Sequence, residues 1–311
     1  MRNLEEIGRT GLMVNPIGLG SNAVGGHNLF QNLNDETGKK IVRAAIQNGI
    51  NFLDSAFIYG MGRSEELIGE VLKESKTRQD IIIATKGAHR IEDGKVIVDN
   101  SPKFLRETVE NSLRRLQTDY IDLFYIHYPD EGTPKDEAIG TLSRLKEEGK
   151  IRAIGVSNFT MDQLTEANKD GNVEVIQAGY NLFKREAENE LIPYSAQHQI
   201  SFIPYFPLAS GLLTGKFSKD TMIEDGRSNN PLFQGEAFLQ NLEKIELLRT
   251  IANDKQADIS SIVLAWYLTQ ATIDTVIPGA KKPEQVLLNI KTLEIELTTE
   301  EIQEIDRIFM A

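Results

Sequence analysis

The sequence contains no cysteine and only four histidines. The absence of cysteine excludes disulfide bonds, thiolate nucleophiles and cysteine-ligated metal sites. The histidines, at positions 27, 89, 127 and 198, do not have the H-x-x-x-H spacing of metal ligands. We therefore predict no metal site.

Long apolar runs and a surplus of positive charge are also missing. No segment reaches membrane-spanning length, and the first residues lack the apolar core of a signal peptide. The chain has 34 Lys and Arg against 46 Asp and Glu, a net charge of −12. Such a balance does not neutralise a nucleic-acid backbone. We expect a soluble cytoplasmic protein, a monomer or weak oligomer, that binds neither nucleic acid nor membrane.

What the sequence does contain is a regular alternation of short apolar segments and helical patterns. Short apolar runs bounded by turn residues are typical of buried parallel strands. The predicted strands span residues 17–21, 50–54, 81–86, 122–127, 153–157, 173–177, 201–206 and 274–278. Eight such strands close an α/β barrel of the (β/α)8 or TIM type. No break in composition marks a second domain, so we predict one domain over residues 1–311.

Helix caps separate the predicted strands, and two segments fall outside the alternation. Ser101-Pro102 has the signature of a helix start, and Thr160 with Gln163 has that of a capping box. Residues 2–14, with a turn at 8–11, predict an N-terminal β-hairpin at the far end of the barrel. Residues 218–235 predict a long βα loop without its own structure at the C-terminal face.

Four titratable side chains lie where predicted strands end. Asp54, Lys86 and His127 close three of the strands, and Tyr59 follows Asp54 by five residues. Taken singly, they could be a helix cap, a snorkelling lysine, a core histidine and a loop tyrosine. In a parallel barrel, however, the C-terminal strand ends open onto one face that carries the chemistry. Their joint placement therefore favours an active site.

The spacing of Asp54, Tyr59, Lys86 and His127 resembles the catalytic tetrad of the aldo-keto reductases. The resemblance implies that Tyr59 is the general acid and that the Lys86 ammonium lowers its pKa from about 10. Asp54 would hold Lys86, and His127 would orient the carbonyl. The implied activity is NADP-dependent reduction of aldehydes or ketones. The alternative is a non-catalytic, redox-sensing NADP-binding subunit, as in the channel-associated members of the family.

Two glycine-rich segments mimic nucleotide-binding motifs, and a third segment is more persuasive. Residues 18–23 match G-x-G-x-x-A, but no helical pattern follows. Residues 211–217 are one residue short of a P-loop and lack its Ser or Thr. In Pro278-Gly279-Ala280-Lys281-Lys282-Pro283, two lysines precede a helix start, which could bind a phosphate or simply be solvated.

The family resemblance implies where NADP would bind. Lys281 and its neighbours would hold the adenosine 2′-phosphate, Asn158 would bind the nicotinamide amide, and Tyr205 would stack on its ring. Arg227 is either a clamp on the cofactor or a solvated loop residue, and Phe206 stands where serine is usual in the family. The complete implied set is Gly20, Ser21, Asn22, Asp54, Ser157, Asn158, Gln177, Tyr205, Phe206, Leu208, Ser210, Gly211, Leu212, Lys216, Arg227, Gly279, Lys281, Gln285 and Asn289.

The substrate pocket is predicted from residues that flank the first two strand ends. Asn22, Phe30 and Phe57, together with His127, are expected to line it. An aromatic wall with one amide fits a sugar aldehyde, an aromatic carbonyl or an aliphatic one equally well. Residues 18–27 and 168–171 further resemble the bacterial branch of the family associated with the myo-inositol catabolism operon.

Overall fold

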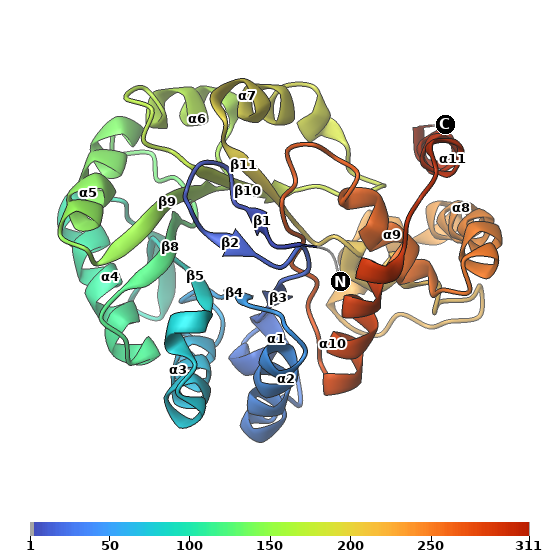
Figure 1. Cartoon of the computed structure of the whole chain (residues 1–311), viewed down its shortest axis with the longest axis horizontal. Helices are drawn as coiled ribbons and strands as arrows, with labels where there is room; N and C mark the ends of the chain where they lie inside the picture. Colours follow the sequence, from blue (N-terminus) through green and yellow to red (C-terminus); the bar gives the residue numbers. More distant parts are fainter. Residues whose placement is uncertain (1–2, 311) are drawn as a thin grey trace.

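The computed structural model of the chain describes residues 3–310 and is built around a curved parallel sheet (Figure 1). Seven strands pair in the order β11-β10-β9-β8-β5-β4-β3. Their bounds are β3 (Leu19–Gly20), β4 (Phe52–Asp54), β5 (Ile82–Gly87), β8 (Ile121–Ile126), β9 (Ile151–Ser157), β10 (Val175–Gly179) and β11 (Ser201–Tyr205). Seven of the eight predicted strands are thus confirmed, with boundaries that shift by up to a few residues.

The eighth predicted strand closes the barrel without forming a regular strand. Gly18 N donates to Val276 O at 2.8 Å, and Val276 N donates to Pro16 O at 2.9 Å. On its other side, Phe202 N donates to Thr272 O at 2.9 Å. Pro16 and Pro278 have no N–H to extend the ladder, so pairing stays limited to isolated bridges. Residues 272–279 nevertheless join β11 to β3, and the fold is a (β/α)8 barrel.

Helices form the outer ring around this sheet (Figure 1). The α-helices are α1 (Asn22–Gly25), α2 (Asp35–Gln47), α3 (Arg63–Ser75), α4 (Pro102–Leu116), α5 (Lys135–Glu147), α6 (Met161–Ala167), α7 (Leu191–His198), α8 (Gly235–Asp254), α9 (Ile259–Tyr267), α10 (Pro283–Ile290) and α11 (Thr299–Met310). Short 3-10 helices are η1 (Arg78–Asp80), η2 (Glu186–Glu188), η3 (Ala209–Thr214), η4 (Gly226–Asn229), η5 (Pro231–Phe233) and η6 (Lys291–Glu294).

The predicted caps start the helices as expected. The Ser101 hydroxyl accepts from Phe104 N at the start of α4, and Thr160 forms a complete capping box with Gln163 at α6. These bonds satisfy amides that have no partner inside the helix. At α5, Pro134 occupies the cap position itself, because the first helical residue is Lys135.

The N-terminal hairpin closes the bottom of the barrel, as predicted. β1 (Glu5–Glu6) pairs antiparallel with β2 (Met13–Val14). Ile7, Leu12 and Val14 are buried, and they pack against inward-facing side chains of the barrel, namely Phe52, Ile82, Ala84, Leu123, Tyr125, Ala153, Val175, Ile203 and Ile277. The lower interior is therefore an apolar core that excludes water.

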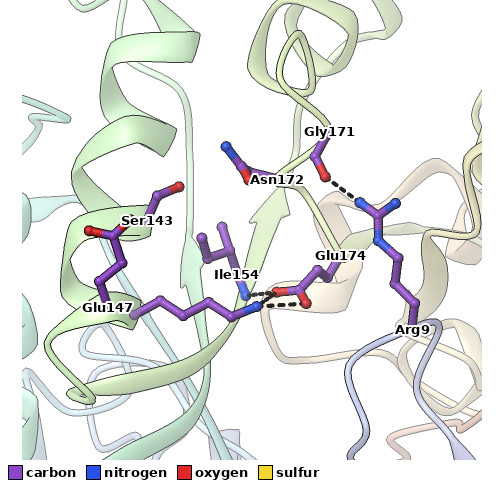
Figure 2. Close-up of a pocket in the computed structure, with 8 residues that line it drawn as sticks. Arg9, Ser143, Glu147, Ile154, Gly171, Asn172 and Glu174 are labelled. Carbon is purple, nitrogen blue, oxygen red and sulfur yellow. Dashed lines mark hydrogen bonds and ion pairs between the residues drawn. The ribbon is translucent and has the colours of Figure 1, made fainter.

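Polar contacts anchor this hairpin to the strand starts. Gly8 N donates to Asp274 Oδ2 at 2.9 Å, and the Arg9 guanidinium donates to the carbonyls of Gly171 and, at 3.2 Å, Val173. A pocket of about 280 Å³ lies beside Arg9 (Figure 2). Its other cation, Lys146, is already paired with Glu174 at 2.8 Å. Both cations of the pocket are therefore engaged by the protein.

Two regions near the C-terminal face differ from the predicted outline. The antiparallel pair β6 (His89–Glu92) and β7 (Lys95–Val98) follows β5 and was not predicted. The turn between them, Asp93-Gly94, is a hairpin signal. The long loop 218–235 contains η4 and η5, so the prediction that it lacks structure is wrong. Its Phe233 is buried against Phe217, which gives the loop an apolar contact of its own.

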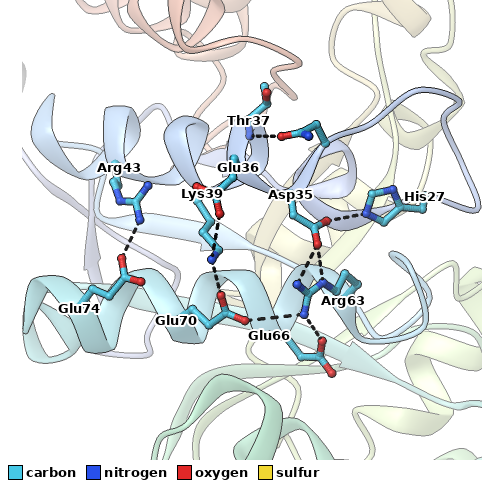
Figure 3. A network of polar contacts seen from close by, with 11 residues as sticks. His27, Asp35, Glu36, Thr37, Lys39, Arg43, Arg63, Glu66, Glu70 and Glu74 are labelled. Carbon is cyan, nitrogen blue, oxygen red and sulfur yellow. Dashed lines mark hydrogen bonds and ion pairs between the residues drawn. The ribbon is translucent and has the colours of Figure 1, made fainter.

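A network of ion pairs joins α2 to α3 (Figure 3). Lys39 pairs with Glu70 at 2.6 Å, and Arg63 pairs with Asp35 at 2.8 Å. His27 Nε2 lies 2.7 Å from Asp35 Oδ1. Exposed pairs of this kind add little stability singly. Together they hold the segment after β3 against the start of α3, close to the loop that carries Tyr59.

Candidate active site

The structure brings the four predicted tetrad residues together at the C-terminal ends of adjacent strands. Asp54 is the last residue of β4, Lys86 lies near the end of β5, and His127 directly follows β8. β4, β5 and β8 are neighbours in the sheet, and Tyr59 lies on the loop after β4. Strand pairing in a parallel sheet thus converts distant sequence positions into one cluster.

Lys86 and Asp54 form a fully buried ion pair at the centre of this cluster. Lys86 Nζ donates to Asp54 Oδ1 at 2.5 Å and to Ser55 O at 2.8 Å, and Gln177 Nε2 donates to Asp54 Oδ2 at 2.9 Å. Burial lowers the pKa of Lys86, while the Asp54 carboxylate opposes that shift. A charge in this position is tolerated only because it is paired and hydrogen-bonded.

Tyr59 lies beside this pair. Its ring centroid is 5.6 Å from Lys86 Nζ and 6.4 Å from the His127 ring, which is perpendicular to it. Burial raises the pKa of Tyr59 well above its ordinary value, and the Asp54 charge adds to the shift. The lowering of this pKa that was expected from Lys86 is not found, because burial of the phenol is the largest influence and acts in the opposite direction. The phenol is protonated and able to donate.

His127 completes the cluster as a neutral imidazole. Its side chain is almost entirely buried, and its backbone N–H donates to Gly87 O at 2.8 Å. Burial, followed by the charge of Lys86, holds the pKa of His127 well below its ordinary value. A neutral imidazole can donate one hydrogen bond without adding a second positive charge beside Lys86.

The residues predicted to bind the nicotinamide are connected to the cluster by hydrogen bonds. Asn158 Nδ2 donates to His127 O at 3.0 Å and to Ser157 Oγ at 3.1 Å, and Tyr205 Oη donates to Asn158 Oδ1 at 2.8 Å. Asn158 has a φ of 61°, a left-handed conformation that asparagine adopts more readily than most residues. Tyr205 and Asn158 are therefore placed together beside the tetrad.

Three cations gather at the opposite end of the predicted cofactor path. Burial, and then the charges of Arg227 and Lys281, lower the pKa of Lys216. One carboxylate, Asp225, faces them, bonded to Arg227 Nε at 2.8 Å and Nη2 at 2.7 Å. Gly211 has a φ of 90°, and a side chain there would meet Lys216 Nζ at 3.1 Å. The surplus of positive charge fits a phosphate group.

Close approach of the first and last strands places the remaining cofactor candidates. Gly20 and Gly279 form a bridge, and a Cβ on Gly20 would lie 2.7 Å from Ile277 O, so only glycine fits there. The position of a Cβ on Gly279 lies 3.1 Å from Asn22 Oδ1. Ser21 Oγ donates to Asp54 O at 2.9 Å. This junction therefore connects the tetrad to the phosphate end.

The helix start at Lys281 is also organised. Lys281 N donates to Gln285 Oε1 at 2.7 Å, and Asn289 is buried in the same helix, α10. Lys281 Nζ lies 4.3 Å from the centroid of the Phe30 ring. Phe30 was predicted to line the substrate pocket. The charged residue it contacts, Lys281, belongs to the predicted cofactor-binding residues and not to the tetrad.

Other predicted residues are placed less directly. Phe57 lies with its ring 5.1 Å from the Arg115 guanidinium. Leu212 is fully buried in the core, so only its backbone could face a cofactor, and Leu208 caps η3 ahead of Ser210. Phe206 is 58% exposed, so the residue that departs from the family pattern has a free aromatic surface.

A family model described as the aldo/keto reductase family matches residues 16–309. The chain belongs to the aldo-keto reductase family. It is therefore a member of a family of oxidoreductases, as the tetrad spacing predicted.

Several aldo-keto reductases are similar to this chain over most of their length. The aldo-keto reductase YhdN of Bacillus subtilis (strain 168) is 37% identical over 90% of this chain and 85% of its own. The NADH-specific methylglyoxal reductase of Escherichia coli (strain K12) is 34% identical over 94% of each chain. The glycerol dehydrogenase AKR11B4 from Gluconobacter oxydans superposes with a TM-score of 0.91, at 35% identity over 98% of this chain and 94% of that one.

In this aldo-keto reductase, two rings that the sequence did not single out lie next to the tetrad. The His89 ring is 5.0 Å from that of His127, and the Tyr128 ring is 5.1 Å from it. Tyr128 directly follows His127, and His89 comes three residues after Lys86. The position of both residues just after predicted strand ends is the feature of the sequence that could have identified them.

Within residues 3–310, no group of His, Asp and Glu is arranged to hold a metal ion. None of the helices described for this chain combines the length and apolar character needed to cross a bilayer.

Proposed function

We propose that this aldo-keto reductase uses NADPH to reduce aldehydes or ketones, with Tyr59 as the proton donor. The observation that carries the proposal is the buried Lys86–Asp54 pair beside a protonated phenol and a neutral imidazole. When bound, the reduced nicotinamide supplies a hydride to the carbonyl carbon. The chain's own residues supply the proton and the positioning.

Proton transfer is assigned to the Tyr59 hydroxyl. Its O–H bond breaks as a new O–H bond forms on the former carbonyl oxygen, which leaves a phenolate on Tyr59. The Lys86 ammonium stabilises that phenolate, and Asp54 with Ser55 O keeps the ammonium in place. His127 donates a hydrogen bond to the substrate oxygen and orients it. The high pKa of Tyr59 ensures that the proton is present at neutral pH.

The preference for NADP over NAD rests on Lys216, Arg227 and Lys281. Three cations facing one carboxylate fit the additional phosphate of NADP, whereas NAD has a hydroxyl there. Tyr205 and Asn158, linked to each other and to His127, would bind the nicotinamide end. Because a similar reductase is named as NADH-specific, the cofactor needs a direct comparison.

The decisive experiment is stopped-flow mixing of NADPH-loaded protein with a panel of aldehydes and ketones, followed by the absorbance of reduced nicotinamide. We expect rapid oxidation of bound NADPH with some members of the panel. If no carbonyl oxidises it, the enzyme proposal is wrong and the redox-sensing, non-catalytic alternative takes its place.

A further inference from the structure

A second imidazole, that of His89, lies beside the tetrad and next to the His127 ring. The His89 and His127 rings are perpendicular and 5.0 Å apart, and the Tyr128 ring lies 5.5 Å from His89 and 5.1 Å from His127. His89 begins β6 and is 8% exposed, the same fraction as His127. A nearly buried polar ring beside a reaction centre needs a reason for being there, since burial of an unpaired polar group is costly.

The ring nitrogens of both histidines are arranged in the same way. In His89 and in His127, Nδ1 is enclosed without any hydrogen-bond partner among residues 3–310. Nε2 of neither ring is among the enclosed atoms that lack a partner. An enclosed N–H without an acceptor is rarer in proteins than an enclosed bare acceptor. We therefore assign the proton to Nε2 in both rings.

This assignment gives the site two hydrogen-bond donors of the same kind. Burial lowers the pKa of His89, so its ring is neutral like that of His127. Each Nε2–H can bind an oxygen at about 2.9 Å. With ring centroids 5.0 Å apart, two oxygens on neighbouring carbons of one small molecule could be bound by the two donors. His127 is already assigned to the carbonyl oxygen, which leaves His89 for the other.

We propose that His89 is a specificity-determining residue that binds a second substrate oxygen on the carbon next to the carbonyl. The preferred substrates are then 2-hydroxy or 2-oxo aldehydes and ketones, and simple aliphatic carbonyls are poor ones. This proposal rests on the proposed carbonyl reduction. A substrate without the second oxygen leaves the His89 donor unpaired, and such sites discriminate strongly.

The test compares glyceraldehyde with propanal, which has the same carbon chain without hydroxyl groups. His89→Phe keeps the ring packed against His127 and removes the donor, whereas His89→Gln keeps an N–H donor. We expect the Phe variant to lose about 10- to 100-fold in kcat/KM for glyceraldehyde, mainly through KM. Propanal turnover and NADPH affinity should be nearly unchanged, and the Gln variant should recover part of the loss.

The matched control is His198→Phe, because His198 lies on α7 and stacks on Tyr194 away from the tetrad. It should leave the preference for glyceraldehyde intact. An equal loss on both aldehydes in His89→Phe would mean that His89 is only structural and would overturn this inference. Wild-type turnover of propanal that matches glyceraldehyde would overturn it too, while supporting carbonyl reduction. Failure of wild type on both aldehydes and on the wider carbonyl panel would overturn the proposed function itself.

Discussion

The two ends of the barrel are built from the same strands but have opposite characters. At the N-terminal end, Ile7, Leu12 and Val14 fill the interior with apolar side chains. At the C-terminal end, the same interior holds a buried lysine and a buried carboxylate, and the partly exposed Tyr59 phenol lies beside them. The transition occurs within β4, where Phe52 belongs to the apolar core and Asp54, two residues later on the same face, belongs to the site.

This contrast separates stability from chemistry. Burial of apolar side chains at the N-terminal end of the barrel raises the free energy of unfolding. Burial of charges at the C-terminal end lowers it unless they are paired, and is tolerated for function. Changes at the bottom should therefore lower stability and spare the reaction. Changes at the C-terminal end should alter the reaction. Those that leave a buried charge without its partner should alter both the reaction and the stability.

The largest effect is expected at Tyr59. Tyr59→Phe removes the proposed proton donor and should lower kcat by about 100- to 10,000-fold. NADPH affinity, measured by fluorescence titration, should be nearly unchanged, because the phenol acts on the substrate oxygen. Substantial turnover by this variant would show that another group donates the proton.

Lys86→Met tests whether one residue at the C-terminal end serves both stability and the reaction. The variant leaves Asp54 buried without its cation, which should lower the free energy of unfolding by about 3–5 kcal/mol. Urea titration measures this, and turnover should also be lost. Glu74→Gln, which breaks the exposed pair with Arg43, is the control and should leave the urea midpoint nearly unchanged. Equal stability of the two variants would argue against the buried pair as a structural element.

Leu12→Ala probes the bottom end. Removing a fully buried leucine from the hairpin should lower the free energy of unfolding by about 2–5 kcal/mol. Leu4→Ala, at a leucine that is 48% exposed, is the matched control and should have little effect. The KM values for carbonyl and NADPH should not change in either variant at low temperature. A change in substrate KM would break the separation between the two ends.

Lys281→Ala addresses the cofactor within the top end. Loss of a charge-assisted contact to the 2′-phosphate should weaken NADPH binding by about 10- to 100-fold. NADH binding should hardly change. The adjacent Lys282→Ala keeps the net charge of the variant equal and should have a much smaller effect on NADPH. Parallel losses for both cofactors would refute the assignment to the 2′-phosphate.

The smallest effect is a pH dependence of stability. His89 and His127 have pKa values below the ordinary 6.5, so below that pH the unfolded chain binds more protons than the folded one. The free energy of unfolding should therefore fall as pH is lowered from about 6.5 towards 5. Urea titrations across this range should show a smaller slope for the double variant His89→Gln with His127→Gln. An unchanged slope would mean that other groups cause the dependence.

Much of the fold was predictable because short apolar runs and helix caps are local signals. Closure of the barrel was less predictable, since residues 272–279 are irregular and pair only through isolated bridges. The β6–β7 hairpin was missed although Asp93-Gly94 marks its turn. Element boundaries depend on tertiary hydrogen bonds, which a single sequence does not contain.

The tetrad was found because Asp54, Lys86 and His127 end predicted strands and Tyr59 follows Asp54 by five residues. The structure brings Asp54 and Lys86 into contact. The raised pKa of Tyr59 was not predicted, since it depends on how far the folded protein removes the hydroxyl from water. His89 was missed because it lies three residues beyond the end of its predicted strand, and only folding brings it beside His127. The single-domain organisation, the cytoplasmic location and the resemblance to the branch associated with myo-inositol catabolism stay predictions.

Barrel closure has a consequence for how the chain is made. Thr275 Oγ1 donates to Asn15 O across 260 residues of sequence, next to the bridges that join the first and last strand segments. Contacts of such long range form late in folding. A growing chain that has not yet reached residue 279 would expose the open edges of β3 and β11, which are sites for pairing with other chains. The last stretch of synthesis, rather than the assembly of the core, is therefore the step most exposed to aggregation.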